Sequence, residues 1–403
     1  MRTLQTLSIL GISPVLQCTA CRHAPLFSHQ DLRPQCPSTL PSSPNPTLFR
    51  RSLTQARLSS SSSPTFSYRI AASFSGKGRR FNPKTDLYSH NSDLELLEGA
   101  FTGRPSSGQD AFFVSKIGNS SSTAFGVADG VGGWSDSGFD SAHFSHGLCQ
   151  WMARGAEMVG VAGGEAEVKK LGPRELLEKA YAGIVADKVV EGGGSTACVA
   201  VGRGDGNLTV ANLGDSGFVQ LRLNAVNYYS NPQTHAFNTP YQLSIVPPRV
   251  LALSKAFGGG PLHDLPKDAG ISTHEVRHGD VLVFATDGVW DNLNPTDLLK
   301  IVSRQMTGFQ AWVNGDKGTE VSDKIYDLAK DGGIAVQVEN SLQSTLAVNI
   351  VGEAKAASVD HKRDGPFAKE VQRFYPHEDW HGGKVDDICV VVAVVIHDEP
   401  APP

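Results

Sequence analysis

The chain has 403 residues, enough for one large domain or two small ones, and 40% of them are hydrophobic, as is usual for soluble globular proteins. The formal net charge of −5 hides an asymmetry: residues 1–80 carry ten Lys/Arg against Asp31 alone, which leaves about −14 for the remainder. The acidic remainder of the chain argues against nucleic-acid binding, which needs a basic surface. No apolar run is long enough for a transmembrane segment.

Residues 1–80 have the composition of a transit peptide followed by a disordered linker. They are rich in Arg and Ser, poor in acids and broken by prolines, and Ser59–Ser63 is an unbroken serine run. A mitochondrion, with the matrix as destination, fits this composition best. A plastid is an alternative, and Arg2 followed by the mildly apolar Leu4–Leu16 leaves a secretory signal open. A disordered tail without a targeting signal also fits this composition. Residues 81–403 are then predicted to form the folded domain.

The remaining chain alternates apolar runs with helical patterns. We predict strands at 111–114, 124–128, 197–201, 208–213, 217–223, 281–286 and 387–396, and helices at 141–158, 173–186, 296–306 and 322–330. The tight turn at Gly204–Asn207 requires its flanking strands to pair antiparallel. Residues 224–267 are expected to be mostly irregular, and 331–384 show no clear pattern. Two groups of strands with helices between them predict a layered α+β sandwich in one domain.

Three features that resemble functional motifs have simpler explanations. Cys149, Cys198 and Cys389 lack metal-ligand spacing and are expected to be free, buried thiols. His143 and His146 lie three apart on a predicted helix, where partly exposed histidines are commoner than a ligand pair. The glycines at 192–194 are followed by a strand and not by Gly-Lys-Ser/Thr, so we expect close backbone packing and not a phosphate loop.

Carboxylates recur at the ends of the predicted strands. The most distinctive stretch is Gly126–Trp134, in which an apolar run ends at Asp129 and three glycines follow within four residues. Further carboxylates end or flank apolar runs at Asp110, Asp215, Asp287 and Asp386-Asp387. Carboxylates that converge on one rim of a sandwich predict a site for a hard divalent cation such as Mg²⁺ or Mn²⁺.

Five short motifs, in this order along the chain, resemble those of the metal-dependent serine/threonine protein phosphatases of the 2C type. They are Asp129-Gly130-Val131-Gly132-Gly133, Gly194-Ser195-Thr196-Ala197, Asn212-Leu213-Gly214-Asp215-Ser216-Gly217, Ala285-Thr286-Asp287-Gly288-Val289-Trp290-Asp291 and Asp386-Asp387. Each motif is weak alone, but the ordered set is specific and spans residues 100–397. The segment Phe237–Ile245 and the Asp-Gly-Val-Gly-Gly-Trp variant are similar to the mitochondrial branch of that family.

The resemblance implies an α/β/β/α sandwich of two antiparallel sheets flanked by helices, with the metal site at one end. It implies that Asp129 bridges two Mg²⁺ or Mn²⁺ ions, that the Gly130 carbonyl binds one, and that Asp287 and Asp386 bind the other. It further assigns Asp110 to a metal-bound water, Asp215 and Asp291 to a weaker third cation, and Arg104 to substrate phosphate. A hydroxide shared by the two cations would then attack phosphorus without a protein base.

Three residues depart from the family pattern. Gln109 stands where relatives usually carry glutamate, and Asp387 stands where many have asparagine. Val131 stands where many carry a histidine thought to protonate the leaving oxygen, so another group or water must supply that proton.

The sequence is therefore interpreted as a Mg²⁺/Mn²⁺-dependent phosphatase, with Asp129, Asp287 and Asp386 at its catalytic centre. We expect a monomer that acts on phosphorylated matrix proteins, and family analogy points to coenzyme Q biosynthesis or general metabolism. Two alternatives remain: a catalytically weak relative that binds a phosphoprotein, and a metal-binding regulatory protein without phosphate chemistry.

Overall fold

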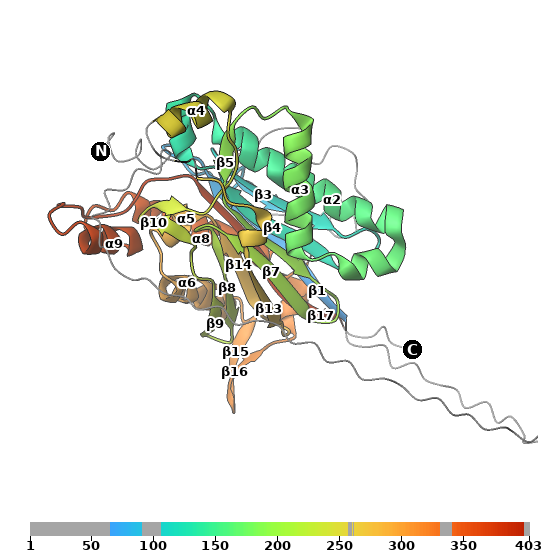
Figure 1. The fold of residues 1–403 in the computed structure, drawn as a ribbon. Coiled ribbons are helices and arrows are strands. Elements are labelled where there is room, and N and C mark those ends of the chain that lie inside the picture. The colour runs from blue at the N-terminus through green and yellow to red at the C-terminus, as the bar shows by residue number, and fades with distance from the viewer. Residues whose placement is uncertain (1–64, 91–105, 257–259, 261, 331–340, 399–403) are drawn as a thin grey trace, which may run out of the picture. The chain divides into compact units, whose positions relative to one another are not determined.

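The computed structural model describes residues 65–90, 106–256, 260, 262–330 and 341–398 (Figure 1). Two antiparallel sheets pack face to face, and helices cover the outer face of each. One sheet has six strands in the order β2-β1-β17-β14-β8-β9, and the other has five in the order β13-β7-β6-β4-β3. This α/β/β/α architecture confirms the predicted fold class.

The six-stranded sheet contains β1 (Thr65–Ser75), β2 (Leu87–Ser89), β8 (Gly217–Arg222), β9 (Ala225–Tyr229), β14 (Val281–Ala285) and β17 (Ile388–Asp398). The five-stranded sheet contains β3 (Asp110–Lys116), β4 (Thr123–Asp129), β6 (Ala197–Gly202), β7 (Asn207–Leu213) and β13 (Gly270–Glu275). Short pairs are formed by β5 (Gly193–Ser195) with β12 (Leu243–Ile245), β10 (Thr234–Ala236) with β11 (Thr239–Pro240), and β15 (Trp312–Gly315) with β16 (Gly318–Val321).

The helices of the described residues are α2 (Ser141–Lys170), α3 (Pro173–Asp187), α4 (Pro248–Ala256), α5 (Asp287–Trp290), α6 (Pro295–Gly308), α7 (Lys324–Leu328), α8 (Leu342–Ser358) and α9 (Pro366–Phe374), with 3₁₀ turns η1 (Gly132–Ser137) and η2 (Pro266–Asp268). Asp140 caps α2 by accepting from the Ala142 N–H, and Pro173 occupies the first turn of α3. Within the described part of the chain, no helix combines the length and apolarity needed to cross a bilayer.

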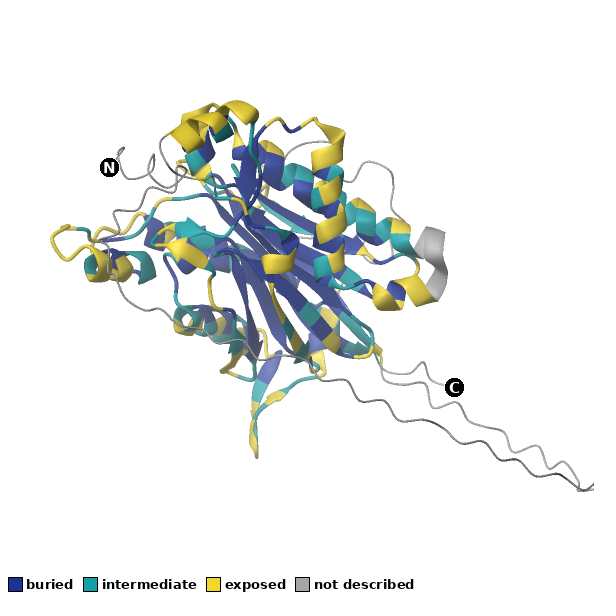
Figure 2. Ribbon diagram, viewed as in Figure 1, coloured by how far each residue is buried: buried dark blue, intermediate teal, exposed yellow. Residues whose placement is uncertain are grey.

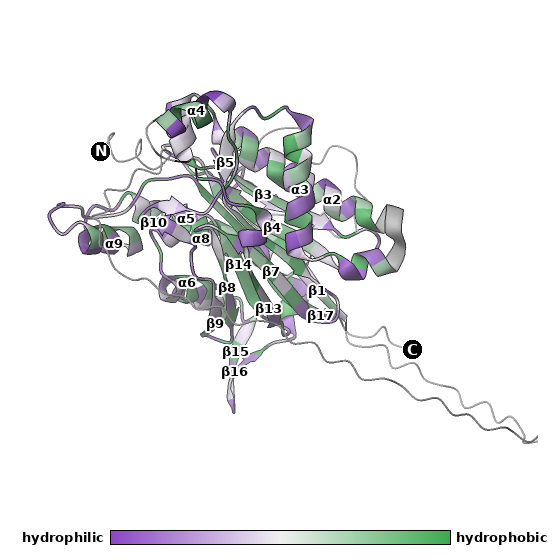
Figure 3. Ribbon diagram, in the orientation of Figure 1, coloured by the Kyte–Doolittle hydropathy of each residue, from purple (hydrophilic) through white to green (hydrophobic). Residues whose placement is uncertain are grey.

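Strand β17 shows why the sandwich forms, since it is buried on both faces. Its odd-numbered residues from Cys389 to Val395 point between the two sheets, where they pack against Phe125 and Phe284. Its even-numbered residues from Ile388 to Ile396 face α6 and α8. A strand with period-two side chains that are apolar on both faces must be covered on both faces, and Figures 2 and 3 show the buried, hydrophobic sheets beneath the helices.

The five-stranded sheet is covered by α2 and α3. Phe144, Leu148 and Met152 of α2 pack with Leu176 and other residues of α3 against that sheet. Helix α2 runs beyond the predicted end at residue 158, through a segment whose glycines at 160, 163 and 164 have low helix propensity. Cys149, Cys198 and Cys389 are free and buried, as predicted.

The predicted domain boundary at residue 80 is wrong. Strand β1 lies inside the six-stranded sheet and pairs with β17 along its whole length, from Thr65↔Asp398 to Ser75↔Ile388. The basic residues that flank this strand, together with its serines, gave the segment the composition of a presequence. Its apolar residues were therefore not recognised as a buried strand. Residues 1–64 lie outside the described residues, so a transit peptide within them stays a prediction.

Two segments with little sequence pattern contain regular structure. Residues 224–267 include β9 to β12 and α4, whose strands are too short for clear alternation. Residues 341–398 include α8, which is buried on several sides and therefore has no single apolar stripe. The predicted helix at 322–330 shortens to α7, and residues 331–340 lie outside the described residues.

Removal of β1 is expected to abolish folding. A chain that begins at Phe81 would expose one edge of β17 and remove Ile70 and Phe74 from between the sheets. A chain that begins at Ser63 keeps every strand and should fold. Circular dichroism and thermal melting of the two purified fragments test this, and cooperative unfolding of the shorter one would contradict it.

Candidate active site

The ends of five strands bring the acidic residues to one end of the sandwich. Asp110 opens β3 and lies opposite Asp129, which closes β4. Asp287 follows β14, and Asp386 precedes β17, the strand that pairs with β14. Asp215 follows β7. Because antiparallel neighbours run in opposite directions, a strand start and a strand end meet at the same rim, and five separated carboxylates converge.

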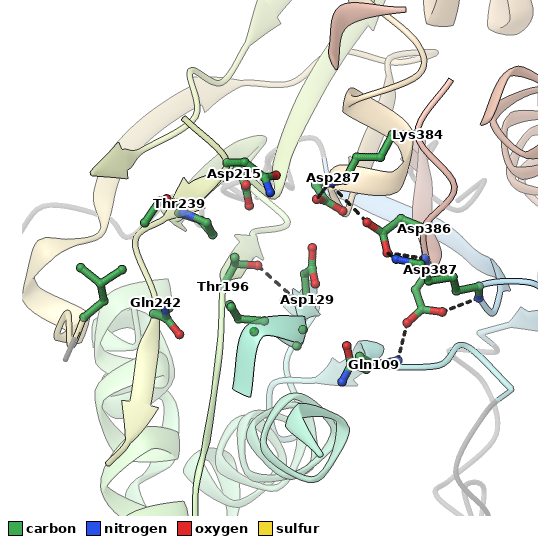
Figure 4. A pocket seen from close by; sticks show the side chains of 18 residues that line it. Gln109, Asp129, Thr196, Asp215, Thr239, Gln242, Asp287, Lys384, Asp386 and Asp387 are labelled. Atoms are coloured by element: carbon green, nitrogen blue, oxygen red, sulfur yellow. Dashed lines mark hydrogen bonds and ion pairs between the residues drawn. The ribbon is translucent and has the colours of Figure 1, made fainter. Parts of the chain in front are cut away.

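A pocket at this rim contains most of the predicted site (Figure 4). Its lining includes Asp129, Gly130, Asp215, Asp287, Asp386 and Asp387, together with Gln109 and Val131. Asp110 and Asp291 do not line the pocket: Asp110 is buried and accepts from the Thr286 hydroxyl at 2.7 Å, and Asp291 binds the Lys384 ammonium. Arg104, predicted to bind phosphate, lies outside the described residues.

The turn after Asp129 is held rigidly. A Cβ at Gly130 would lie 2.7 Å from the Gln109 carbonyl oxygen and 2.9 Å from that of Ser141, so only glycine fits. The buried Trp134 indole donates to Gln242 Oε1 at 2.8 Å and ties the turn to the segment before β12. The backbone oxygens of the turn are therefore placed by close packing on both sides.

Asp387 joins the two segments that border the pocket. Its carboxylate accepts from the backbone N–H groups of Lys77, at 2.5 Å, and Gln109, at 2.8 Å. Burial raises the pKa of Asp387, and these two hydrogen bonds offset part of the increase. A carboxylate can accept both bonds, whereas an asparagine amide offers one oxygen and one donor group, which explains aspartate at this position.

The clustered carboxylates repel one another. Burial and then the charge of Asp287 raise the pKa of Asp129 well above its usual range, and burial followed by the charge of Asp387 does the same at Asp110. Burial and Asp287 raise the pKa of Asp215 to about 7. This excess of buried negative charge is the electrostatic situation that bound cations relieve.

Two lysines that the sequence analysis missed lie among these carboxylates. Lys384 Nζ is 2.6 Å from Asp287, 2.5 Å from Asp291 and 3.3 Å from Asp386. Lys77 Nζ is 3.0 Å from the other oxygen of Asp386. Burial acts to raise the pKa of Asp386, but these two ammonium groups outweigh it and the pKa is lowered. Lys384 precedes the Asp-Asp pair by two residues, which was the only sequence signal; Lys77 lay in the segment assigned to the presequence.

The donor set suits hard divalent cations, although it is not a closed cage. Among the described residues, no three His, Cys, Asp or Glu side chains surround one point as a ready metal cluster. Mg²⁺ and Mn²⁺ accept few carboxylates, because water and backbone carbonyls complete their shells. Asp215 Oδ1 is buried without a hydrogen-bond partner, so at least one oxygen is in place for a ligand. The residues therefore fit such ions.

Sequence comparison identifies the family. The mitochondrial protein phosphatase 2C homolog 7 of Saccharomyces cerevisiae is 32% identical over 339 residues, which cover 84% of this chain and 85% of the relative. The chain belongs to the 2C-type protein phosphatases. A second relative, the PTC7 homolog fig of Drosophila virilis, is 33% identical over 79% of this chain and 84% of its own. No protein-family model matches the chain.

A solved structure agrees with this assignment. The chain resembles the photosystem II phosphatase PBCP with a TM-score of 0.50 and 25% identity, over 71% of this chain and 91% of that one. The resemblance predicted from the five motifs is thus confirmed, and the protein is a serine/threonine phosphatase of a metal-dependent family.

The metal-free phosphatase is expected to lose stability as pH rises. The folded-state pKa of Asp215, about 7, lies above its ordinary value, so its stabilising contribution is present below about pH 4 and lost as pH rises through 7. Between pH 5 and pH 8, wild type in EDTA should lose about 1–3 kcal/mol of unfolding free energy relative to Asp215→Asn. Urea denaturation at both pH values measures this difference, and parallel pH dependence of the two proteins would contradict it.

Proposed function

We propose that this phosphatase hydrolyses phosphoserine and phosphothreonine with two Mg²⁺ or Mn²⁺ ions. Asp129 would hold both ions, the Gly130 carbonyl one of them, and Asp287 and Asp386 the other. When bound, the cations acidify water and offset charge on the transferring phosphoryl oxygens. The observation that carries the proposal is the convergence of Asp129, Gly130, Asp287 and Asp386 from separate strand ends in one pocket.

The chain's own residues position these groups. The Thr286 hydroxyl donates to Asp110 and its oxygen accepts from the Cys389 N–H at 3.0 Å, so one side chain connects β3, β14 and β17 behind the pocket. Asp110, held in this way behind the pocket, is proposed to orient a water bound to the ions. Gln109 offers the pocket a neutral amide, which accepts hydrogen bonds from water without adding to the negative charge.

Lys77 is proposed to meet the substrate phosphate. Its side chain is 57% exposed and lines the pocket, while Asp387 holds its backbone. An ammonium at the pocket entrance attracts a dianionic phosphate and compensates for the surrounding carboxylates. Arg104 stays a prediction for the same role.

Lys77→Met is expected to raise KM for a phosphopeptide about tenfold, because a charge-assisted contact worth about 1.5 kcal/mol is lost. Lys77→Arg should retain most of the affinity. Lys179→Met, an exposed lysine on α3, is the matched control and should behave as wild type. Steady-state kinetics with a phosphothreonine peptide measure these values. Unchanged KM in Lys77→Met would exclude the phosphate contact.

The proposed location is the mitochondrial matrix. The Saccharomyces relative is named as mitochondrial, and the basic, acid-poor composition of the chain before Thr65 supports a presequence. We propose that the protein acts there as a monomer on phosphorylated matrix proteins, with coenzyme Q biosynthesis suggested by analogy alone. Mass spectrometry of the organelle-resident protein should find a mature N-terminus before Thr65, and an intact Met1 would contradict import with cleavage.

A catalytically weak phosphoprotein-binding module is the second candidate. Val131 and Gln109, which line the pocket in place of residues usual in relatives, favour it. Hydrolysis of a phosphopeptide by the full chain, with Mn²⁺ and with EDTA, separates the candidates. Mn²⁺-dependent turnover supports the enzyme; phosphopeptide binding without turnover supports the module.

A further inference from the structure

Lys384 is fixed to the fold at its backbone. Its N–H donates to Asn292 Oδ1 and its carbonyl accepts from Asn292 Nδ2, both at 2.9 Å. Asn292 is itself buried and also donates to the Gly288 carbonyl in α5. One asparagine thus ties the segment before β17 to α5, the helix that begins at Asp287. The lysine therefore enters the acidic cluster from a fixed point.

The Lys384 side chain is enclosed by groups that suit a cation. Its ammonium contacts Oδ2 of Asp287, Asp291 and Asp386, at 2.6, 2.5 and 3.3 Å. An ammonium has three N–H donors, and three carboxylate oxygens surround it. The Phe367 ring, 5.0 Å from Nζ, adds a favourable cation–π contact, and the side chain is only 15% exposed. Figure 4 shows Lys384 beside Asp287 and Asp386.

We propose that the Lys384 ammonium permanently occupies the place of a third divalent cation. The proposal rests on the two-metal function proposed above. The family resemblance assigns a weaker third ion to Asp215 and Asp291, and the ammonium already binds Asp291 together with the proposed ligand Asp287. A third divalent ion would need the Asp291 carboxylate at about 2.0–2.1 Å. It would have to displace an ammonium that three carboxylates surround, on a lysine whose backbone makes two hydrogen bonds to Asn292. The residues therefore do not fit a third metal.

The consequence is a site in which the third positive charge is the ammonium group of Lys384, a part of the chain itself, and not a bound metal ion. Asp291 then serves to bind Lys384, and it acts on the metal centre only through that lysine. The ion count should be two at any free Mn²⁺ concentration up to the millimolar range. Lys384 also contacts Asp287 and Asp386 through one oxygen each, so it helps to orient both proposed ligands.

The test counts the Mn²⁺ ions that the full chain binds. The protein is first stripped of metal and then dialysed against Mn²⁺ at up to 2 mM free concentration, and elemental analysis gives the number of ions bound per chain. Wild type should bind two, and Lys384→Met should bind three, because the freed Asp291 carboxylate can accept a further ion together with Asp215. Lys77→Met, which removes a lysine from the same pocket, is the matched control and should gain none. A third ion in wild type, or no added ion in folded Lys384→Met, would overturn the proposal.

A second variant keeps the test decisive if Lys384→Met does not fold. With the lysine intact, Asp291→Asn should leave both the ion count and the Mn²⁺ affinities within twofold of wild type, since its partner is an ammonium. Loss of an ion or a tenfold fall in affinity would make Asp291 a metal ligand and overturn the proposal. Fewer than two ions in wild type would instead contradict the two-metal function, and the gain in Lys384→Met would still decide the role of the lysine.

Discussion

Asp129→Asn is expected to reduce phosphopeptide hydrolysis by more than about 100-fold. Even groups that only support a metal ligand cost 10–100-fold in metal affinity or activity when removed, and Asp129 is proposed to hold both cations. Asparagine keeps the shape of the side chain and the turn into Gly130. The burial and the neighbouring charges that raise the Asp129 pKa show that its ionised form is repelled when metal is absent. Losing that charge should therefore leave the metal-free fold intact or slightly more stable.

The measurements are Mn²⁺-dependent hydrolysis, calorimetry of Mn²⁺ binding and thermal melting in EDTA. Asp316→Asn makes the same chemical change at an exposed position in the β15–β16 hairpin and should leave all three unchanged. If Asp129→Asn kept wild-type turnover and Mn²⁺ affinity, the proposed bridging role would be wrong and the Gly-rich segment would serve only as a turn.

The sequence predicted the architecture and the acidic site because both depend on local signals. The strands β3, β4, β6, β7, β14 and β17 are apolar runs, and the carboxylates at the ends of all of them except β6 are visible in the sequence whatever the packing. The family motifs then supplied an order that made the convergence of Asp129, Asp287 and Asp386 expected. All three line one pocket in the structure, and their catalytic roles stay predictions.

What the sequence did not predict depends on partners far along the chain. Strand β1 is recognisable only from its pairing with β17, more than 300 residues away, because its own flanks are basic and serine-rich. As a lone lysine in a loop, Lys384 gave no signal beyond its position two residues before the Asp-Asp pair. Its role comes from Asp287 on α5, from Asp291 at the C-cap of that helix and from Asn292, and no periodicity within the loop predicts those contacts.

Asp387 shows the same limit in a residue that the sequence analysis noticed. Its departure from the usual asparagine was visible, but the reason was not. The two backbone N–H groups that donate to the Asp387 carboxylate belong to Lys77, which lies before β2, and to Gln109, which lies just before β3. Gly108, with a φ of +74°, would place a Cβ 2.1 Å from the Asp387 carboxylate, so this arrangement also requires a glycine there.

Gly288→Ala is expected to be the most damaging small substitution near the site. Gly288 follows Asp287 in α5, where the helix packs against the start of β17. A Cβ at this position would lie 1.9 Å from the Asp387 carbonyl oxygen and 3.0 Å from Ile388 Cγ1. The nearest obstacle is backbone, so no side-chain rotation relieves the clash and α5 must move away from β17.

That movement would separate Asp287 on α5 from Asp386 and Lys384 on the segment that leads into β17. A displacement of about 1 Å in positioned catalytic groups can cost about 100-fold in rate, so we expect kcat/KM to fall by that order. Overpacking in a buried contact should also lower the unfolding free energy by about 1–3 kcal/mol.

Gly308→Ala is the matched control, because a Cβ on this last residue of α6 meets nothing within 4 Å. It should keep full activity and gain up to about 1 kcal/mol from higher helix propensity. Urea denaturation and steady-state kinetics of both variants separate the two effects. Wild-type kcat/KM in Gly288→Ala would show that hydrolysis does not depend on the close packing of α5 against β17.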